Sequence, residues 1–242
     1  MSLRRIAVAS AYLCLAAGLR QGGKWVVRPR WERLTPMGGM TDVGRGVARR
    51  IFTPVASVLL RLHVSPDAVT IVGTLGVAVS ALVFFPQGRF FLGTLVICLF
   101  VFSDALDGTM ARLAGRSSHW GAFLDSSLDR IADAAVFVGI VLWFAGDGDD
   151  LLMAAVVLAG LVGGFMVSYV RARAEALGAR ADVGVAERTE RLVLILAATG
   201  LSGLFDLPVL LTIGAWAVAI LAWVTFLQRM YVVRAQLLHG RS

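Results

Sequence analysis

Four aspartates occupy one short stretch of a chain that is otherwise apolar enough to live in a lipid bilayer. Asp104 and Asp107 are three residues apart, and Asp125 and Asp129 are four apart. On helices each pair shares one face, so two carboxylate pairs can face each other. Each carboxylate at membrane depth costs about 2.5–3.5 kcal/mol, so four uncompensated ones cost roughly 10 kcal/mol, comparable to the whole stability of a domain. A bound cation is therefore expected.

The residues near these aspartates indicate a hard divalent cation. His63, His119 and His239 show no metal-ligand spacing, and the only two cysteines, Cys14 and Cys98, lie in apolar segments. No zinc site or disulfide framework is therefore available. A ligand set of carboxylate oxygens alone suits Mg²⁺ or Mn²⁺.

The composition predicts an all-α integral membrane protein with a bundle of six transmembrane helices. Of the 242 residues, 58% are hydrophobic, and the apolar runs are bounded by charge, Gly or Pro. The net charge of +7 does not indicate nucleic acid, because the basic residues fall between apolar runs, where they set topology or meet anionic membrane lipid. The expected spans are 66–85, 90–112, 121–145, 151–171, 190–205 and 208–228.

The chain as a whole is expected to divide into two parts. Residues 1–40 lack periodicity and are expected to be poorly ordered or dispensable, whereas residues 41–242 form the membrane domain. From Asp42, apolar residues recur at helical spacing opposite arginines, which predicts an amphipathic helix at the membrane surface. Pro54 is expected to bend this helix.

Loop charges predict the orientation in the membrane. With a cytoplasmic N-terminus, nearly all arginines after residue 40 lie inside, while the outer loops hold Arg89 and the acidic residues Asp147, Asp149 and Asp150. This asymmetry predicts a multi-pass protein of the plasma membrane with both termini inside. The aspartates then lie at the cytoplasmic face.

The spacing of the aspartates resembles the signature of the CDP-alcohol phosphotransferases. The eight fixed positions are Asp104, Asp107, Gly108, Ala111, Arg112, Gly121, Asp125 and Asp129. Members of that family are integral membrane enzymes that transfer a substituted phosphate from a CDP-linked donor to an alcohol. The resemblance implies two metal ions, Mg²⁺ or Mn²⁺, at the four aspartates, Asp129 as the catalytic proton acceptor, and a homodimer.

The segment from Ser65 to Thr70 opens the first expected span. As a helix start it needs no further role, with Ser65 or Asp67 as the cap and Pro66 in the first turn. It also resembles the family's Pro-Asn-x-x-Thr element, with Asp67 in place of Asn, a form similar to that of the actinobacterial phosphatidylinositol phosphate synthases. The resemblance implies that CDP-diacylglycerol is bound by Asp67, Ala68, Val69, Thr70, Gly108, Arg112 and Ser118.

A second polar stretch, residues 168–191, gathers arginines at the ends of the later spans. Charge alone explains it equally well as a basic loop that sets orientation. Arginines at three span ends could instead form a pocket for a phosphate, which guanidinium binds bidentately. The resemblance to the phosphatidylinositol phosphate synthases implies inositol 1-phosphate as the acceptor, with its phosphate near Ser168, Arg171, Arg191 and Arg229.

Two other functions remain open from the sequence. One is a transferase of the same family that uses glycerol 3-phosphate as acceptor. The other is a cation transporter whose intramembrane aspartates form the ion path. A permeation path needs polar groups through the full membrane depth, whereas these cluster at one face. The sequence therefore favours the enzyme.

The shared metal site predicts that the four aspartates act as one unit. Any single Asp→Asn change, including Asp107→Asn, is expected to abolish release of CMP from CDP-diacylglycerol, because each carboxylate helps to hold the metals. The measurement is turnover by the purified protein at saturating metal. Near-normal turnover in Asp107→Asn would contradict the metal site.

Overall fold

The computed structural model describes the backbone of residues 19–21, 24–26, 54, 56–59, 61–62, 64–113 and 119–239. Within these ranges it does not describe the side chains of residues 19–21, 24–26, 102–109, 111–113 and 239. The chain divides into two compact units, Met1–Ile51 and Phe52–Ser242. Each unit is described by itself.

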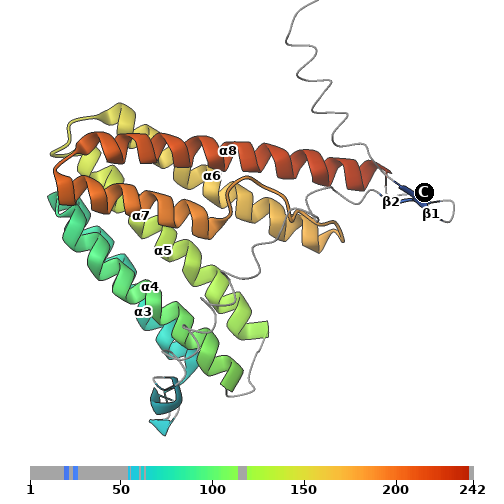
Figure 1. Ribbon diagram of the computed structural model, residues 1–242, viewed down its shortest axis with the longest axis horizontal. Coiled ribbons are helices and arrows are strands. Elements are labelled where there is room, and N and C mark those ends of the chain that lie inside the picture. Colours follow the sequence, from blue (N-terminus) through green and yellow to red (C-terminus); the bar gives the residue numbers. More distant parts are fainter. Residues whose placement is uncertain are drawn as a thin grey trace, which may run out of the picture. The chain divides into compact units, whose positions relative to one another are not determined.

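The first unit contains a short antiparallel hairpin. Strand β1 (Leu19–Gln21) pairs with β2 (Lys24–Val26), and Leu19 lies opposite Val26 (Figure 1). The sequence analysis did not predict this hairpin.

Most of the amphipathic helix expected from Asp42 lies outside the described residues, but residues 54, 56–59 and 61, which belong to the second unit, are helical.

The described part of the second unit contains six long α-helices at the positions of the six expected spans. They are α3 (Pro66–Phe84), α4 (Phe90–Leu113), α5 (His119–Ala145), α6 (Leu151–Ala176), α7 (Arg188–Phe205) and α8 (Pro208–His239). A 3-10 helix, η2 (Phe85–Gln87), follows α3. Helices α6 and α8 continue beyond the expected ends at residues 171 and 228. The expected ends were wrong because an apolar run stops at the first charges, whereas a helix continues through charged residues that can reach water.

Local side-chain bonds fix where the helices begin. Ser65, not Asp67, caps α3, and its hydroxyl accepts a hydrogen bond from the Ala68 N–H at 3.2 Å. At α7 the Glu187 N–H donates to the carboxylate of Glu190, three residues later, at 2.8 Å. This is the reciprocal pattern that starts a helix. It makes Arg188 the first residue of α7.

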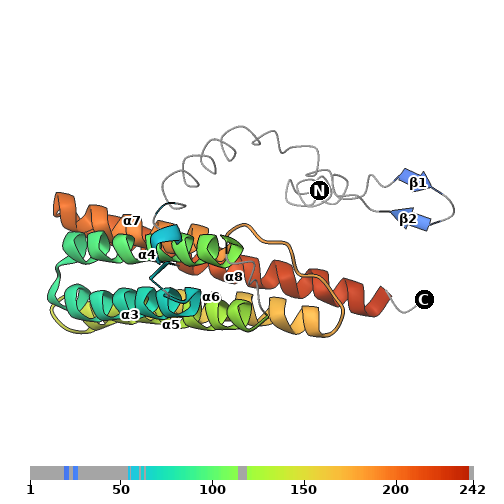
Figure 2. The same cartoon turned by 90° about the horizontal axis from the view of Figure 1, so that it is seen from below.

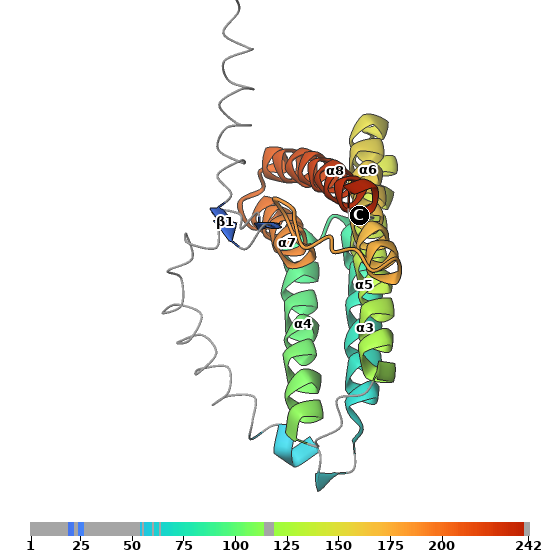
Figure 3. The ribbon, with the colours of Figure 1, turned by 90° about the vertical axis from the view of Figure 1, so that its right-hand side faces the viewer.

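The six helices pack as a bundle in which α5 lies between α3 and α6. Helix α3 also packs on α4, α6 packs on α8, and α7 packs on both α4 and α8. In Figure 2, α3, α5 and α6 lie in one layer and α4 and α7 in another. Figure 3 shows α3 and α4 running side by side along their length. The core between them is formed by apolar side chains, among them Ala81, Ile97, Val136, Ile195 and Val218.

Small residues let these helices approach closely. A Cβ added at Gly139 of α5 would come within 2.5 Å of the Ala81 carbonyl oxygen on α3. On α6, a Cβ at Gly163 would lie 3.0 Å from the Ala222 side chain of α8. Lipid tails are as apolar as leucine, so close packing rather than water exclusion holds membrane helices together. Gly163 therefore lets α6 pack closely on α8.

The protein is a membrane protein by the length and apolarity of its helices. The segments Pro66–Gln87, Leu151–Ala176 and Pro208–Leu238 are each long and apolar enough to cross a bilayer. The apolar part of α4, Phe90–Val101, is shorter. Large apolar side chains such as Val72, Leu99 and Leu227 are exposed on the bundle's outer surface. Such surface suits lipid rather than water.

Removal of residues 1–39 is expected to leave the membrane domain intact. The helices of the second unit have their own core, so a chain that begins at Met40 should insert and unfold at the same temperature as the full chain. The measurements are membrane fractionation, thermal unfolding in detergent, and the transferase activity expected above. Failure to insert or to turn over would contradict this prediction.

Candidate active site

Helix α5 presents two of the four predicted aspartates on consecutive turns. Asp125 is exposed, whereas the Asp129 side chain is only 19% exposed. One turn further along lies Asp133, whose side chain is 14% exposed. Three carboxylates therefore run along one face of α5, from the helix start toward the core.

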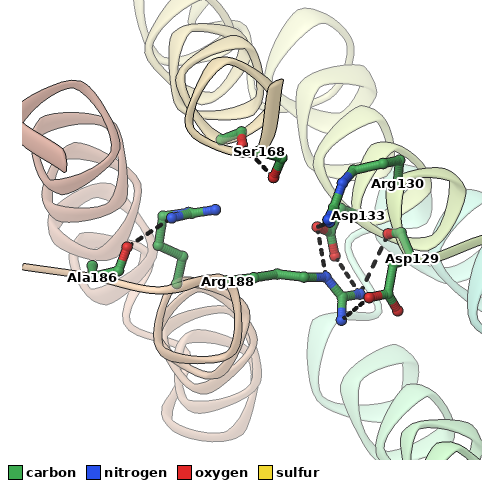
Figure 4. Close-up of polar contacts among 8 residues, drawn as sticks. Asp129, Arg130, Asp133, Ser168, Ala186 and Arg188 are labelled. Atoms are coloured by element: carbon green, nitrogen blue, oxygen red, sulfur yellow. Dashed lines mark hydrogen bonds and ion pairs between the residues drawn. The ribbon is translucent and has the colours of Figure 1, made fainter. Parts of the chain in front are cut away.

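The guanidinium of Arg188, at the start of α7, joins two of these carboxylates (Figure 4). Its Nη1 lies 2.9 Å from Asp129 Oδ2. Its Nε donates to Asp133 Oδ2 at 3.0 Å, and its Nη2 donates to Asp133 Oδ1 at 2.9 Å. The Nη2 group also lies 3.3 Å from the Asp129 carbonyl oxygen. Charge-assisted pairs with this forked geometry are among the stronger hydrogen bonds in proteins.

A cavity of about 50 Å³ opens beside Asp129 and Arg188. Thr70, Gly73 and Thr74 of α3 line it, together with Ile97, Phe100 and Val101 of α4 and Leu192 of α7. A second, smaller cavity shares Arg188 with the first and is lined also by Asp133, Gly164 and Arg191. Arg188 therefore lines two cavities, one on the α3–α4 side and one on the α6–α7 side.

The predicted metal ligands are only partly described. Asp104 and Asp107 belong to α4, but their side chains lie outside the described residues, as do those of Arg112 and Ser118 and the surroundings of Gly108. Among the described side chains no three His, Cys, Asp or Glu residues come together as metal ligands. Val101 lines the cavity beside Asp129, and Asp104 follows it by one helical turn. Among the predicted metal ligands whose side chains are described, Asp129 lines this cavity, and its carboxylate oxygens are of the kind that a divalent cation prefers.

The predicted donor residues of α3 lie at the start of that helix. Thr70 lines the larger cavity, and its hydroxyl donates to the Pro66 carbonyl oxygen at 3.1 Å. Asp67 is partly buried one turn before it. Ala68 and Val69 are partly buried between them. Thr70 is thus the predicted donor residue that the structure brings to the same cavity as Asp129.

Two of the predicted acceptor arginines are buried and hold the loop between α6 and α7. Arg191 is 5% exposed, and its Nη1 donates to the Ala186 carbonyl oxygen at 2.8 Å. Arg229 is 3% exposed, and it donates from Nε to Val183 O at 2.8 Å and from Nη1 to Val167 O at 3.0 Å. Each guanidinium therefore uses part of its donor set on the backbone. The sequence analysis did not predict these bonds to the backbone.

The remaining acceptor residues differ from these two. Arg171 is exposed, and its guanidinium pairs with Glu175 at 3.1 Å and with Asp182 at 3.4 Å. The Ser168 hydroxyl donates to the Gly164 carbonyl oxygen at 3.2 Å, within α6. A pair as exposed as Arg171 with Glu175 contributes little to stability. Arg171 can therefore exchange its carboxylate partners for another anion at small cost.

A family model matches most of the chain. The CDP-alcohol phosphatidyltransferase model covers residues 63–232. The chain belongs to the CDP-alcohol phosphatidyltransferase family. It is therefore an enzyme of the transferase class, and the alternative of a cation transporter is set aside. The matched segment includes every predicted site residue, from Asp67 to Arg229.

Two similar relatives are phosphatidylinositol phosphate synthases. The chain is 49% identical to that of Streptomyces avermitilis over 219 residues, covering 87% of this chain and 90% of the relative. It is 47% identical to that of Cutibacterium acnes over 192 residues, covering 76% of this chain and 93% of the relative. These relatives confirm the similarity to the phosphatidylinositol phosphate synthases that the sequence analysis stated.

Solved structures of a phosphatidylinositol phosphate synthase from Mycobacterium tuberculosis share the fold. The structure with CDP-DAG bound has a TM-score of 0.73 and 42% identity, covering 76% of this chain and 94% of that one. The structure in complex with manganese and citrate has the same TM-score and identity and covers 76% and 88%. That relative therefore binds both a CDP-linked lipid and a divalent metal.

The structure adds two residues that the sequence analysis did not assign to the site. Arg188 and Asp133 were both left out of the predicted site. The available signal was the spacing of Asp125, Asp129 and Asp133, which extends the aspartate series by one further turn.

Loss of the Arg229 guanidinium is expected to destabilise the fold. Arg229→Met keeps an apolar side chain of similar length but leaves the carbonyl oxygens of Val167 and Val183 without these donors. Leaving buried polar groups unpaired costs about 1–3 kcal/mol. Thermal unfolding in detergent should show a lower unfolding temperature.

The matched control is Arg234→Met, an exposed arginine on the same helix. It is expected to change the free energy of unfolding by less than about 0.5 kcal/mol. Equal unfolding temperatures for the two variants would show that the Arg229 hydrogen bonds do not stabilise the fold.

Proposed function

We propose that this chain transfers the phosphatidyl group from CDP-diacylglycerol to inositol 1-phosphate and releases CMP. The observation that carries the proposal is the position of Arg188 and Asp129. Both line the cavity that contains Thr70, and Arg188 also lines the adjoining cavity with Arg191. A CDP-linked donor on the α3–α4 side and a phosphorylated acceptor on the arginine side would then meet at Asp129.

The reaction is a direct displacement at the β-phosphorus of the donor. A hydroxyl oxygen of inositol 1-phosphate forms the new bond to phosphorus, the bond from phosphorus to the CMP oxygen breaks, and CMP leaves. The hydroxyl proton passes to Asp129, which is partly buried beside the cavity. A carboxylate within hydrogen-bond reach of the attacking hydroxyl can serve as the general base.

Asp104, Asp107, Asp125 and Asp129 would hold two Mg²⁺ or Mn²⁺ ions. Bound metal of this kind neutralises the pyrophosphate and stabilises the attacking and leaving oxygens. The donor's nucleotide would be held by Asp67, Ala68, Val69, Thr70, Gly108, Arg112 and Ser118. Thr70, at the cavity beside Asp129, supports this assignment among the described residues.

The acceptor's phosphate would be bound at the α6–α7 side. Arg191 and Arg229 are anchored through one part of each guanidinium by backbone carbonyls, which fixes the orientation of the rest. Arg171 and Ser168 lie at the end of α6, the helix whose Val167 carbonyl Arg229 holds. Anchored guanidinium groups lose little conformational entropy on binding a phosphate. An acceptor without phosphate would not make use of them.

The same arrangement supports a six-span topology with the site at the cytoplasmic face. Each of the six helices overlaps a predicted span, and the start of α7 and the later parts of α6 and α8 carry the arginines. The loop before α6 carries Asp147, Asp149 and Asp150. This distribution favours both termini inside the plasma membrane. A homodimer, implied by the resemblance alone, also remains part of the proposal.

The acceptor assay tests the proposal. The purified protein, with CDP-diacylglycerol and Mn²⁺ or Mg²⁺, is expected to release CMP fastest with inositol 1-phosphate. Loss of a charge-assisted phosphate contact costs about 1.5–3 kcal/mol, so free inositol should be used roughly 10- to 150-fold less efficiently. Chelation of the metal should stop turnover, and added Mn²⁺ should restore it.

Glycerol 3-phosphate provides the matched comparison, because it carries a phosphate on a different alcohol. Equal use of free inositol would contradict the phosphate pocket. A preference for glycerol 3-phosphate would place the chain with another activity of the same family.

A further inference from the structure

Asp133 is a partly buried carboxylate on the face of α5 that carries Asp125 and Asp129. Both of its oxygens accept hydrogen bonds from one side chain, Arg188, at 3.0 and 2.9 Å. Arg130, three residues before it, also approaches, with its Nη1 3.7 Å from Asp133 Oδ2. Asp133 is not one of the four aspartates of the family signature, so the metal site does not explain it.

The paired bonds determine how Arg188 is oriented. A guanidinium is planar, and two hydrogen bonds from Nε and Nη2 to one carboxylate fix that plane and its direction. The remaining terminal nitrogen, Nη1, then lies 2.9 Å from Asp129 Oδ2. Without Asp133, the Arg188 side chain could rotate about several bonds and leave Asp129.

The bond to Asp129 orients the group that receives the proton. Asp129 lies one turn after Asp125 in the first half of α5. Its carboxylate can rotate about its own side-chain bonds unless a partner fixes it. Arg188 contacts both the Asp129 carboxylate and the Asp129 carbonyl oxygen. The chain of contacts therefore runs from Asp133 through Arg188 to Asp129 (Figure 4).

A purely structural role is the alternative, because the same bonds also link α5 to α7. Two features favour a role for Arg188 in the site as well as in linking α5 to α7. Arg188 lines both cavities at the site, and the Glu187 and Glu190 pair fixes it as the first residue of α7. Helix α7 also packs on α4, where Gly200 meets Thr94, so its position does not depend on the Arg188 bonds alone.

We propose that Asp133 is a positioning residue for the transfer reaction and acts through Arg188 to hold the Asp129 carboxylate in place. This inference rests on the function proposed above. It assigns Asp133 no contact with donor or metal, and although Asp133 lines the smaller cavity, both of its oxygens are bound to Arg188 rather than offered to the acceptor. Its effect on the reaction must therefore disappear when Arg188 is absent.

A double-mutant cycle on the full chain tests the inference. The four proteins are wild type, Asp133→Asn, Arg188→Ala and the double variant, assayed with inositol 1-phosphate at saturating metal. Misplacement of a reacting group by about 1 Å can cost roughly 100-fold, so Asp133→Asn is expected to lower kcat/KM roughly 10- to 100-fold. The double variant should be no slower than Arg188→Ala by more than about threefold, because coupled residues are not additive.

Two further variants separate positioning from folding. Asp133→Glu keeps the carboxylate and should retain more activity than Asp133→Asn. Asp150→Asn makes the same chemical change at the cap of α6, where Asp150 accepts from the Met153 N–H at 2.9 Å, and Asn is also a good cap. It should leave kcat/KM within about twofold, and its effect should multiply with that of Arg188→Ala. If Asp133→Asn is not recovered folded, Asp133→Ser takes its place in the cycle.

The outcomes distinguish the two hypotheses. Unchanged kcat/KM with a lower unfolding temperature would show that the pair only holds the fold together. Effects of Asp133→Asn and Arg188→Ala that multiply fully would show that Asp133 does not act through Arg188. If the wild type prefers another acceptor, the proposed function is wrong, and the same cycle run with that acceptor still tests Asp133.

Discussion

A charge buried among apolar helices must find its partner inside the protein, because lipid offers none. The partly buried Arg188 guanidinium meets this requirement with two carboxylates of α5, Asp129 and Asp133. The buried arginines Arg191 and Arg229 meet it differently, with carbonyl oxygens of the α6–α7 loop and of α6. Unpaired buried charges are strongly destabilising. These contacts therefore determine how the start of α7 and the preceding loop are placed.

The close packing of small residues makes this placement possible. Gly139 brings α5 against α3, and Gly163 brings α6 against α8. Gly184 has a φ of +151° and lies where a Cβ would meet the Thr225 side chain, so a larger residue would push the loop off α8. Thr225 also accepts a hydrogen bond from the Ala186 N–H at 3.2 Å. Helix packing and loop anchoring thus set the geometry of the same site.

The arrangement also explains how one helix can serve two substrates. Helix α5 packs on α3, which carries the predicted donor residue Thr70, and on α6, which leads to the predicted acceptor arginines. Asp129 lies between these two sides. A transferase must bring donor and acceptor to one atom, and a group held from both sides is suited to that requirement. Arg188 crosses from α7 to this position.

The sequence by itself determined the helices and the family, and it predicted the polar residues of the site. Long apolar runs have one stable form in a bilayer, since every backbone group must be satisfied within its helix, so the six helices appear where the runs predict them. The spacing of Asp104, Asp107, Asp125 and Asp129 pointed to the family through its resemblance to the family signature. Tertiary structure alone decided which arginine meets Asp129, that Asp133 holds it, and that Arg191 and Arg229 also bind loop carbonyls. Apart from Arg191 with Ala186, five residues earlier, these pairings join residues 46 to 62 positions apart. They depend on how the helices pack, which periodicity along a single helix does not specify.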